Sequence, residues 1–106
     1  MSDRHLMHEL LEKNWVGPVL QSGEFAESVV EALAADNPEA EIRVFPAGSW
    51  IRVLAESPLK LRRDSLRAVL GRDVRFPGEV EVNLSAFAGQ IRTSSDEIEW
   101  YFGPKP

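Results

Sequence analysis

The sequence predicts an α+β fold: one compact domain with two main helices and mostly antiparallel sheets. The chain has 106 residues, which is the length of one ordinary domain. Its composition, 43% hydrophobic and 27% charged, is that of a globular protein. Segments that alternate with period two are mixed with two segments of helical periodicity. Their order, β-α-β-β followed by α-β-β-β, is typical of the α+β class.

The chain begins with a short polar segment, residues 1–14, which we predict to be a flexible N-terminal leader. Its apolar residues fall at helical spacing, but an isolated segment of this length is marginal as a helix in water. We assign residues 15–106 to the single domain. Residues 15–20 predict the first strand. Gly17 and Pro18 make this strand irregular, because proline is confined to strand edges, strand starts and bulges.

The strongest helical signal covers residues 24–35. Its apolar residues recur every four positions, at Phe25, Val29 and Leu33. Ser22 is the predicted N-cap, because its hydroxyl suits the free backbone N–H groups of a first turn. The Asp-Asn-Pro sequence at residues 36–38 ends this helix, since proline disfavours the helical conformation of the residue before it.

Two strands, residues 41–45 and 49–55, flank the turn residues Pro-Ala-Gly and predict a hairpin. Leu59 and Leu61 extend or follow that sheet. A second, shorter helix is predicted at residues 63–70. Gly71 then occupies the position after a helix end that favours a left-handed backbone.

The last part of the chain predicts three strands. Residues 79–84 alternate cleanly and follow a Pro-Gly turn. Their inward side chains would be Val80, Val82 and Leu84. Residues 90–93 and 97–102 predict a final hairpin. Its buried face would consist of Ile98, Trp100 and Phe102. Of the other two tryptophans, we expect Trp50 in the core and Trp15, beside the leader, partly exposed.

Composition and charge exclude several classes of function. The chain has no cysteine, which excludes a disulfide framework, a thiolate metal site and a cysteine nucleophile. Its net charge of −5 disfavours binding to a phosphate backbone. No apolar run approaches the ~18 residues of a membrane span. We therefore expect no nucleic-acid or membrane partner, and a cytoplasmic location.

The chain offers little catalytic chemistry. Its two histidines, His5 and His8, lie in the leader, and we interpret them as part of a solvated tail rather than as metal ligands. Ser49 and Ser85 have no histidine expected within reach as a base. No phosphate-binding glycine loop occurs. The residues favour a binding or regulatory protein with no catalytic residue, cofactor or metal, rather than an enzyme.

Five stretches, in a characteristic order and spacing, are distributed between residues 14 and 102, a span that is most of the chain. They are VGPVL from Val16, ADNPEAEI from Ala35, LRAVLGR from Leu66, EVEVNLSAFAGQI from Glu79 and DEIEWYF from Asp96. Each stretch alone is a weak signal. Together they resemble the effector proteins, also called coupling or regulatory proteins, of bacterial multicomponent di-iron monooxygenases. The resemblance is closest to the toluene and alkene monooxygenase branch.

This resemblance implies a regulatory protein that binds the hydroxylase component of such a system. That hydroxylase holds the di-iron centre and hydroxylates or epoxidises a hydrocarbon, with oxygen and with electrons from NADH. The effector would be non-catalytic, free of cofactors, and a monomer when free. It would couple electron delivery and oxygen activation to product formation.

The stretch at residues 82–92 combines small residues with one aromatic ring, which indicates a close approach of its backbone to the core or to a partner. The candidates for the hydroxylase interface are Val16, Gly17, Pro18, Asp36, Asn37, Asn83, Ser85, Phe87 and Gly89. Several have an internal alternative. Asn83 and Ser85 would bond the chain's own turn. Phe87 would lie under its own sheet, the Gly-Pro pair would be a strand irregularity, and the Asp-Asn pair would be a helix stop.

Two other hypotheses remain beside the effector. A generic acidic adaptor domain would bind another protein but no di-iron hydroxylase. A small enzyme with an unrecognised site would turn over a substrate alone, although the sequence offers no base to support it.

Overall fold

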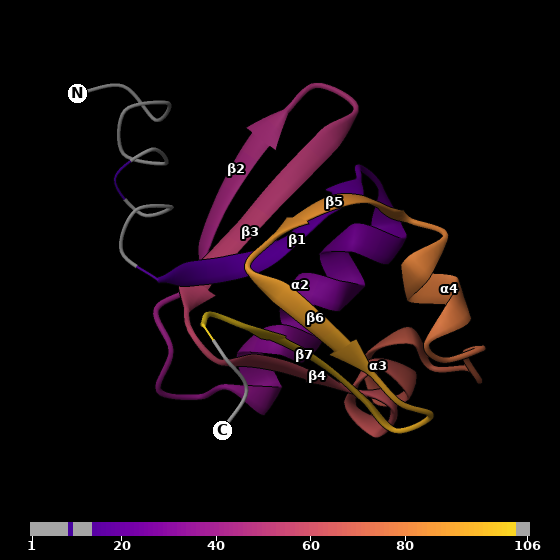
Figure 1. Cartoon of the computed structure of the whole chain (residues 1–106). Coiled ribbons are helices and arrows are strands. Elements are labelled where there is room, and N and C mark those ends of the chain that lie inside the picture. The colour runs from indigo at the N-terminus through magenta and orange to yellow at the C-terminus, as the bar shows by residue number, and fades with distance from the viewer. Residues whose placement is uncertain (1–8, 10–13, 104–106) are drawn as a thin grey trace.

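The computed structural model describes residue 9 and residues 14–103, and these residues have the predicted α+β fold with antiparallel sheets (Figure 1). The elements in chain order are β1 (Trp15–Gln21), α2 (Glu24–Asp36), β2 (Arg43–Ala47), β3 (Trp50–Glu56), β4 (Leu59–Arg62), α3 (Arg63–Leu70), α4 (Gly78–Glu81), β5 (Leu84–Ala88), β6 (Gln90–Thr93) and β7 (Glu97–Tyr101). Except for one segment, the predicted strands and helices agree with these bounds to about two residues. The predicted leader lies outside the described residues apart from residues 9 and 14.

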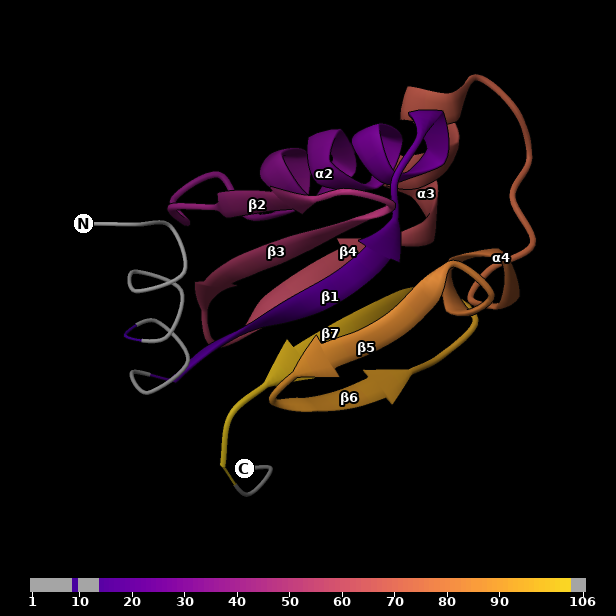
Figure 2. The same ribbon diagram turned by 90° about the horizontal axis from the view of Figure 1, so that it is seen from above.

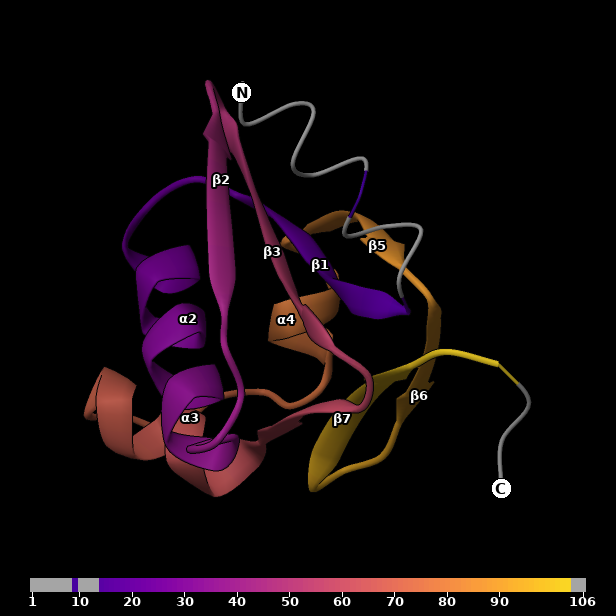
Figure 3. The same ribbon diagram turned by 90° about the vertical axis from the view of Figure 1, so that its left-hand side faces the viewer.

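The described strands form two antiparallel sheets, with the orders β2-β3-β1-β5 and β4-β7-β6. Figure 2 shows α2 along one side of the molecule and β5 and β6 along the opposite side. In Figure 3, β2 lies beside α2, while β5 lies beyond β1. Strand β1 is therefore central, and its pairing with β3 skips Gly17 and Pro18, which is the irregularity that the sequence predicts.

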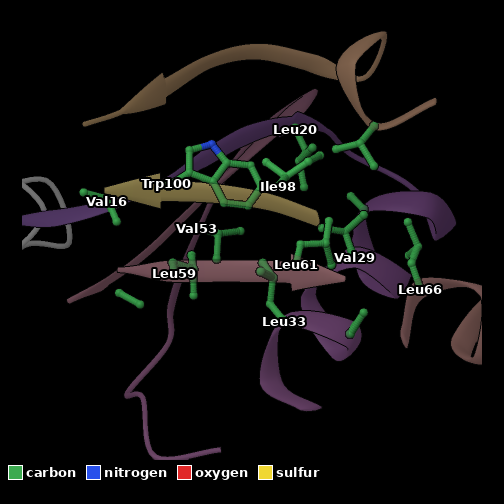
Figure 4. Packing of buried hydrophobic residues seen from close by; sticks show 14 of the residues in the cluster. Val16, Leu20, Val29, Leu33, Val53, Leu59, Leu61, Leu66, Ile98 and Trp100 are labelled. Carbon is green, nitrogen blue, oxygen red and sulfur yellow. The ribbon is translucent and has the colours of Figure 1, made fainter. Parts of the chain in front are cut away.

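One hydrophobic core joins the two sheets to α2 and α3. Figure 4 shows side chains from β1, α2, β3, β4, α3 and β7 meeting in one cluster. Val29 and Leu33 of α2 are fully buried in it, as their spacing predicts. The largest buried side chain is Trp100 of β7, whose indole N–H has no acceptor among the described residues. Removing this much apolar surface from water is the main source of stability for the fold.

The predicted N-cap of the first helix is wrong. The α2 helix begins after Gly23, and no side chain caps it. The Ser22 hydroxyl instead donates to the carbonyl oxygen of Gly48, 3.1 Å away, in the turn between β2 and β3. A contact distant in sequence thus replaces the local one. The predicted end of α3 is confirmed, because Gly71 has a left-handed φ of 70°.

The strand predicted at residues 79–84 is wrong in its first part. The short helix α4 occupies this segment, and β5 begins only at Leu84. A helix turns by about 100° per residue, so two residues are about 200° apart around the axis. Val80 therefore points into the core, whereas Val82 is 79% exposed. The alternating pattern of a strand predicted instead that both side chains point into the core.

Two aromatic residues expected in the core lie at the surface. Trp50 is 39% exposed at the start of β3, where its neighbour on β2 is the small Ala47. Phe102 is 54% exposed, because it follows Tyr101, the last residue of β7, and no described strand pairs beyond that point. The predictions for Trp100, fully buried, and for Trp15, half-buried, are confirmed.

Candidate partner-binding surface

Three candidate residues, Val16, Gly17 and Pro18, are buried in β1 between β3 and β5. Gly17 has a φ of +149°, a conformation that L side chains rarely adopt. A Cβ atom built on it would lie 3.0 Å from the carbonyl carbon of Val53 and even closer to the carbonyl oxygen. The close approach that this glycine permits is to the protein's own backbone. These residues set the position of β5 and offer a partner little surface.

Asp36 and Asn37 use their polar atoms within the chain. The Asn37 Nδ2 donates to the carbonyl oxygens of Leu33, at 2.8 Å, and Lys60, at 2.7 Å. Its Oδ1 accepts the Lys60 N–H at 3.1 Å. The Asp36 Oδ2 accepts the Arg62 N–H at 2.7 Å. These bonds join the end of α2 to the edge of β4, which is a larger role than the helix stop that the sequence indicates.

Asn83 is half-buried at the connection between α4 and β5. Its Nδ2 donates to the carbonyl oxygen of Glu79, 2.8 Å away, and its own carbonyl oxygen accepts the Gln21 N–H at 3.0 Å. Both groups hold α4 and the start of β5 against the end of β1. The residue therefore positions the exposed strand that follows it.

Gly89 turns the chain from β5 into β6 with a φ of +87°. A Cβ atom there would lie 2.5 Å from Val16 Cγ1 and 2.7 Å from the carbonyl oxygen of Tyr101. Real Cβ atoms do not approach other atoms this closely, so the glycine is required by the fold. The atoms around Gly89 in its own chain are therefore enough to explain why this residue is a glycine, without a partner at this position.

Ser85 and Phe87 are the candidates that do present side chains to solvent. Both lie on β5, the last strand of its sheet, and Phe87 is 41% exposed. Burial of Phe87 under its own sheet, the internal alternative, does not occur. Ser85 lies where the pairing shifts, because Leu84 opposes Leu20 whereas Ala86 opposes Val19. Such a bulge redirects the side chains near it.

The described residues contain no group of three or more His, Cys, Asp or Glu side chains able to hold a metal ion. The two histidines weighed in the sequence lie outside them. No helix in this part of the chain has the length and apolarity needed to cross a bilayer. A hollow of about 370 Å³ beside α4 is lined by Arg75, Gly78, Glu79 and Val82. The sequence did not indicate this hollow, because alternation placed Val82 in the core.

Arg72 and Glu79 form a bidentate ion pair near this hollow, with Nη2–Oε2 at 2.6 Å and Nη1–Oε1 at 3.3 Å. The hydrogen bonds from Arg72 lower the pKa of Glu79, and the bonds from Glu79 raise the pKa of Arg72. A carboxyl whose pKa is lowered by folding stabilises the fold above its unfolded pKa. That stabilisation is lost as the pH falls through the folded pKa.

A Glu79→Gln variant is therefore expected to unfold at a slightly lower urea concentration than the original chain at neutral pH, and at the same concentration in strong acid. The effect is small because the Arg72 side chain is 51% exposed, so water screens the ion pair. Glu81→Gln, a change at an exposed carboxylate of the same helix, is the control and should change neither midpoint. An equal deficit of Glu79→Gln at both pH values would show that the ion pair is not its cause.

Comparison with known proteins places this chain in a family. Residues 14–101 match the MmoB/DmpM family. The chain belongs to that family. This member is 34% identical over 92 residues to the effector subunit of the alkene monooxygenase system of Xanthobacter autotrophicus strain Py2, over 87% of this chain and 90% of that protein. It is 36% identical over 84 residues to DmpM, the stimulatory component of phenol 2-monooxygenase from Pseudomonas sp. strain CF600, over 76% and 88% respectively.

Solved structures carry the same fold as this MmoB/DmpM family member. Two chains from structures of a phenol hydroxylase–regulatory protein complex superimpose on it with TM-scores of 0.70 and 0.64, at 29% and 31% identity. They cover 84% and 81% of this chain and 99% of their own lengths. The resemblance to monooxygenase effector proteins that the five stretches indicate is confirmed.

Proposed function

We propose that this chain is the regulatory component of a bacterial multicomponent monooxygenase and that it binds the di-iron hydroxylase component of that system. The observation that carries the proposal is the family match over residues 14–101. Two relatives in that family are an effector subunit and a stimulatory component of monooxygenases. The chain is a non-catalytic component, and its cysteine-free sequence supplies no thiolate ligand for a redox centre.

Regulation by such a protein is a shift in population. The effector binds one conformation of the hydroxylase more tightly than the others and so raises the fraction of hydroxylase in that conformation. A coupling free energy of about 1–3 kcal/mol changes this equilibrium about 5- to 150-fold. Electron delivery and oxygen activation then occur mainly in the conformation that turns over substrate.

The surface that we assign to the hydroxylase is centred on Ser85 and Phe87 of β5. These two candidates are exposed, and Phe87 is an aromatic side chain of the kind that dominates binding energy at interfaces. We assign the other candidates a supporting role. Val16, Gly17, Pro18 and Gly89 fix the position of β5, Asn83 fixes its start, and Asp36 and Asn37 fix the second sheet.

We place the system in the toluene and alkene branch and the protein in the cytoplasm. The relative from the alkene monooxygenase system covers the larger share of this chain. The hydroxylase takes its electrons from NADH, which is supplied inside the cell. The free protein is expected to be a monomer, because it must present its surface to the hydroxylase.

The function is tested by titrating the full chain into a hydroxylase of this branch that is supplied with its reductase and electron carrier. Product formed per NADH consumed should rise and saturate at about one effector per active site. An unchanged ratio, together with no complex in gel filtration, would reject that hydroxylase as the partner. The same result with a phenol-branch and an alkene-branch hydroxylase would favour the generic adaptor instead.

A Phe87→Ala variant is expected to need about thirtyfold more protein for half-maximal activation, because truncating a central interface aromatic costs about 2 kcal/mol. Trp50→Ala is the control, since Trp50 is an aromatic residue of similar exposure, 39% against 41%, in the same sheet. It should activate at the original concentration. If both variants stay folded and activate equally well, Phe87 lies outside the interface.

A further inference from the structure

The outer edge of β5 has no partner strand in the described part of the chain. This strand pairs with β1 on one side, and no other strand in the described residues pairs with it. The strand that follows, β6, turns away at Gly89 and pairs with β7 (Figure 1). Three consecutive residues, Ser85, Ala86 and Phe87, are exposed. A buried strand face would instead expose every second residue. The outward-facing backbone N–H and C=O groups of β5 have no strand partner in the described residues.

The other three sheet edges in the described residues carry a charge, a proline or a side-chain cover, and β5 carries none of these. Strand β2 carries Pro46, which has no N–H, and the charged Arg43. The edge of β4 is covered by the Asn37 side chain, which bonds both backbone groups of Lys60. Strand β6 has four residues and carries Arg92. Charges, prolines, short length and cover are the usual means by which proteins prevent edge-to-edge pairing.

Strand β5 has five residues and a bulge at Ser85, but it has no charge, no proline and no side-chain cover from the described residues. Residues 82–91 contain no charged side chain and no proline, in a chain in which 27% of residues are charged. A strand edge without charges or proline favours aggregation unless a partner covers it. Ser85 and Phe87, the exposed residues of the surface assigned to the hydroxylase, lie on the same strand. The open edge is thus continuous with that surface.

We propose that β5 binds its partner by strand addition: an extended, uncharged segment of the hydroxylase pairs with the outer edge of β5 and becomes the fifth strand of the four-stranded sheet. Main-chain hydrogen bonds supply the affinity in this mode, and pockets for alternate side chains supply the specificity. The segment is uncharged, because a charge brought against this edge would lose water without gaining a counterion. This inference rests on the proposed function.

A second copy of the chain fits the edge less well than a hydroxylase segment. Two β5 strands would pair about a two-fold axis, so each residue would face its symmetry-related position. The register shift at Ser85 lies on one side of Ala86 only. The two halves of β5 therefore differ in backbone geometry, which disfavours regular pairing about such an axis. A segment of different sequence has no such constraint.

Amide hydrogen exchange of β5 tests this proposal, measured for the free chain and for its complex with the hydroxylase. Successive residues of a strand direct their N–H groups to opposite sides. Strand addition should therefore slow the outward-facing amides of β5 by about tenfold or more, while those that face β1 change little. A saturated, activating complex in which β5 exchange is unchanged, or is slowed equally at successive residues, overturns strand addition and leaves the proposed function intact.

Two matched variants complete the test. Ala86→Lys puts a charge on the β5 edge and should weaken binding about tenfold or more. Ala47→Lys makes the same change on an exposed position of β2, the opposite edge of the same sheet, and should bind normally. Equal binding by both variants overturns the proposal. Protection of β5 in a dimer without hydroxylase assigns the edge to a second copy and also overturns it. If no hydroxylase binds the chain, the proposed function fails together with this inference.

Discussion

A Gly17→Ala variant is expected to lose about 3 kcal/mol or more of its free energy of unfolding. The left-handed backbone at Gly17, with a φ of +149°, is strained for any residue with a Cβ atom. The added methyl group would also meet the carbonyl group of Val53 in β3, which is backbone and cannot rotate away. Relief requires β1 and β3 to separate, and β1 is the central strand. Domains of this size are stable by only about 5–15 kcal/mol, so much of the population would unfold.

Gly48→Ala is the control for this prediction. Gly48 also has a positive φ, +64°, but no atom lies within 4 Å of the position that its Cβ would occupy. Its substitution should cost about 1 kcal/mol, from backbone conformation alone. Urea unfolding followed by circular dichroism gives both free energies. Equal losses for the two variants would mean that the β1–β3 contact relaxes without cost.

An Asn37→Asp variant is expected to be destabilised by about 3 kcal/mol, although the two side chains have the same shape. The amide group of Asn37 donates to two carbonyl oxygens, at 2.8 Å and 2.7 Å. An ionised carboxylate has no hydrogen to donate, so it would face both oxygens with a negative charge and break both side-chain bonds. The Leu33 oxygen would keep only the bond from the backbone N–H of residue 37. At acidic pH the loss of unfolding free energy in Asn37→Asp should be smaller, because the protonated carboxyl regains one hydrogen-bond donor. The free energy of unfolding at neutral and acidic pH measures both effects.

Asp36→Asn is the matched control, since it makes the reverse change at the adjacent residue. The Asp36 carboxylate only accepts hydrogen bonds, from the Arg62 N–H and the Ser65 hydroxyl. An amide keeps one acceptor for the Arg62 N–H and can donate to the Ser65 oxygen, so the loss should stay below about 1 kcal/mol. If the folded forms of both variants activate the hydroxylase normally, the pair has the structural role described here. Reduced activation by a fully folded Asp36→Asn variant would instead indicate that Asp36 contacts the hydroxylase.

The sequence indicated only part of what the structure shows at the proposed partner-binding surface. The sequence stretch around Phe87 was recognised, and the structure leaves Ser85 and Phe87 exposed. The same motif also contains Asn83 and Gly89, which lie against atoms of the chain itself. Motif resemblance does not separate residues that touch a partner from residues that hold those residues in place. That distinction depends on depth in the fold, which neighbouring strands decide.

Local pattern determined the class of the fold and most of its elements. Four-residue spacing identified α2, a glycine marked the end of α3, and alternation identified the strands of the last hairpin. These features arise from backbone geometry and from apolar side chains within a few positions of one another. The lack of cysteine and the negative net charge likewise excluded whole classes of function without any structure.

Only the tertiary structure decided which strand is central and which edge is open. Alternation reports that a strand has a buried face, but not which strands lie beside it. The strand order put β1 between β3 and β5, which buried Gly17, and it left β5 at the margin. The same limit explains Val82 and Trp50, whose exposure depends on a helical turn and on a small neighbour on the next strand. These outcomes depend on contacts with residues that are distant in sequence. The periodicity and composition of one segment therefore do not predict them.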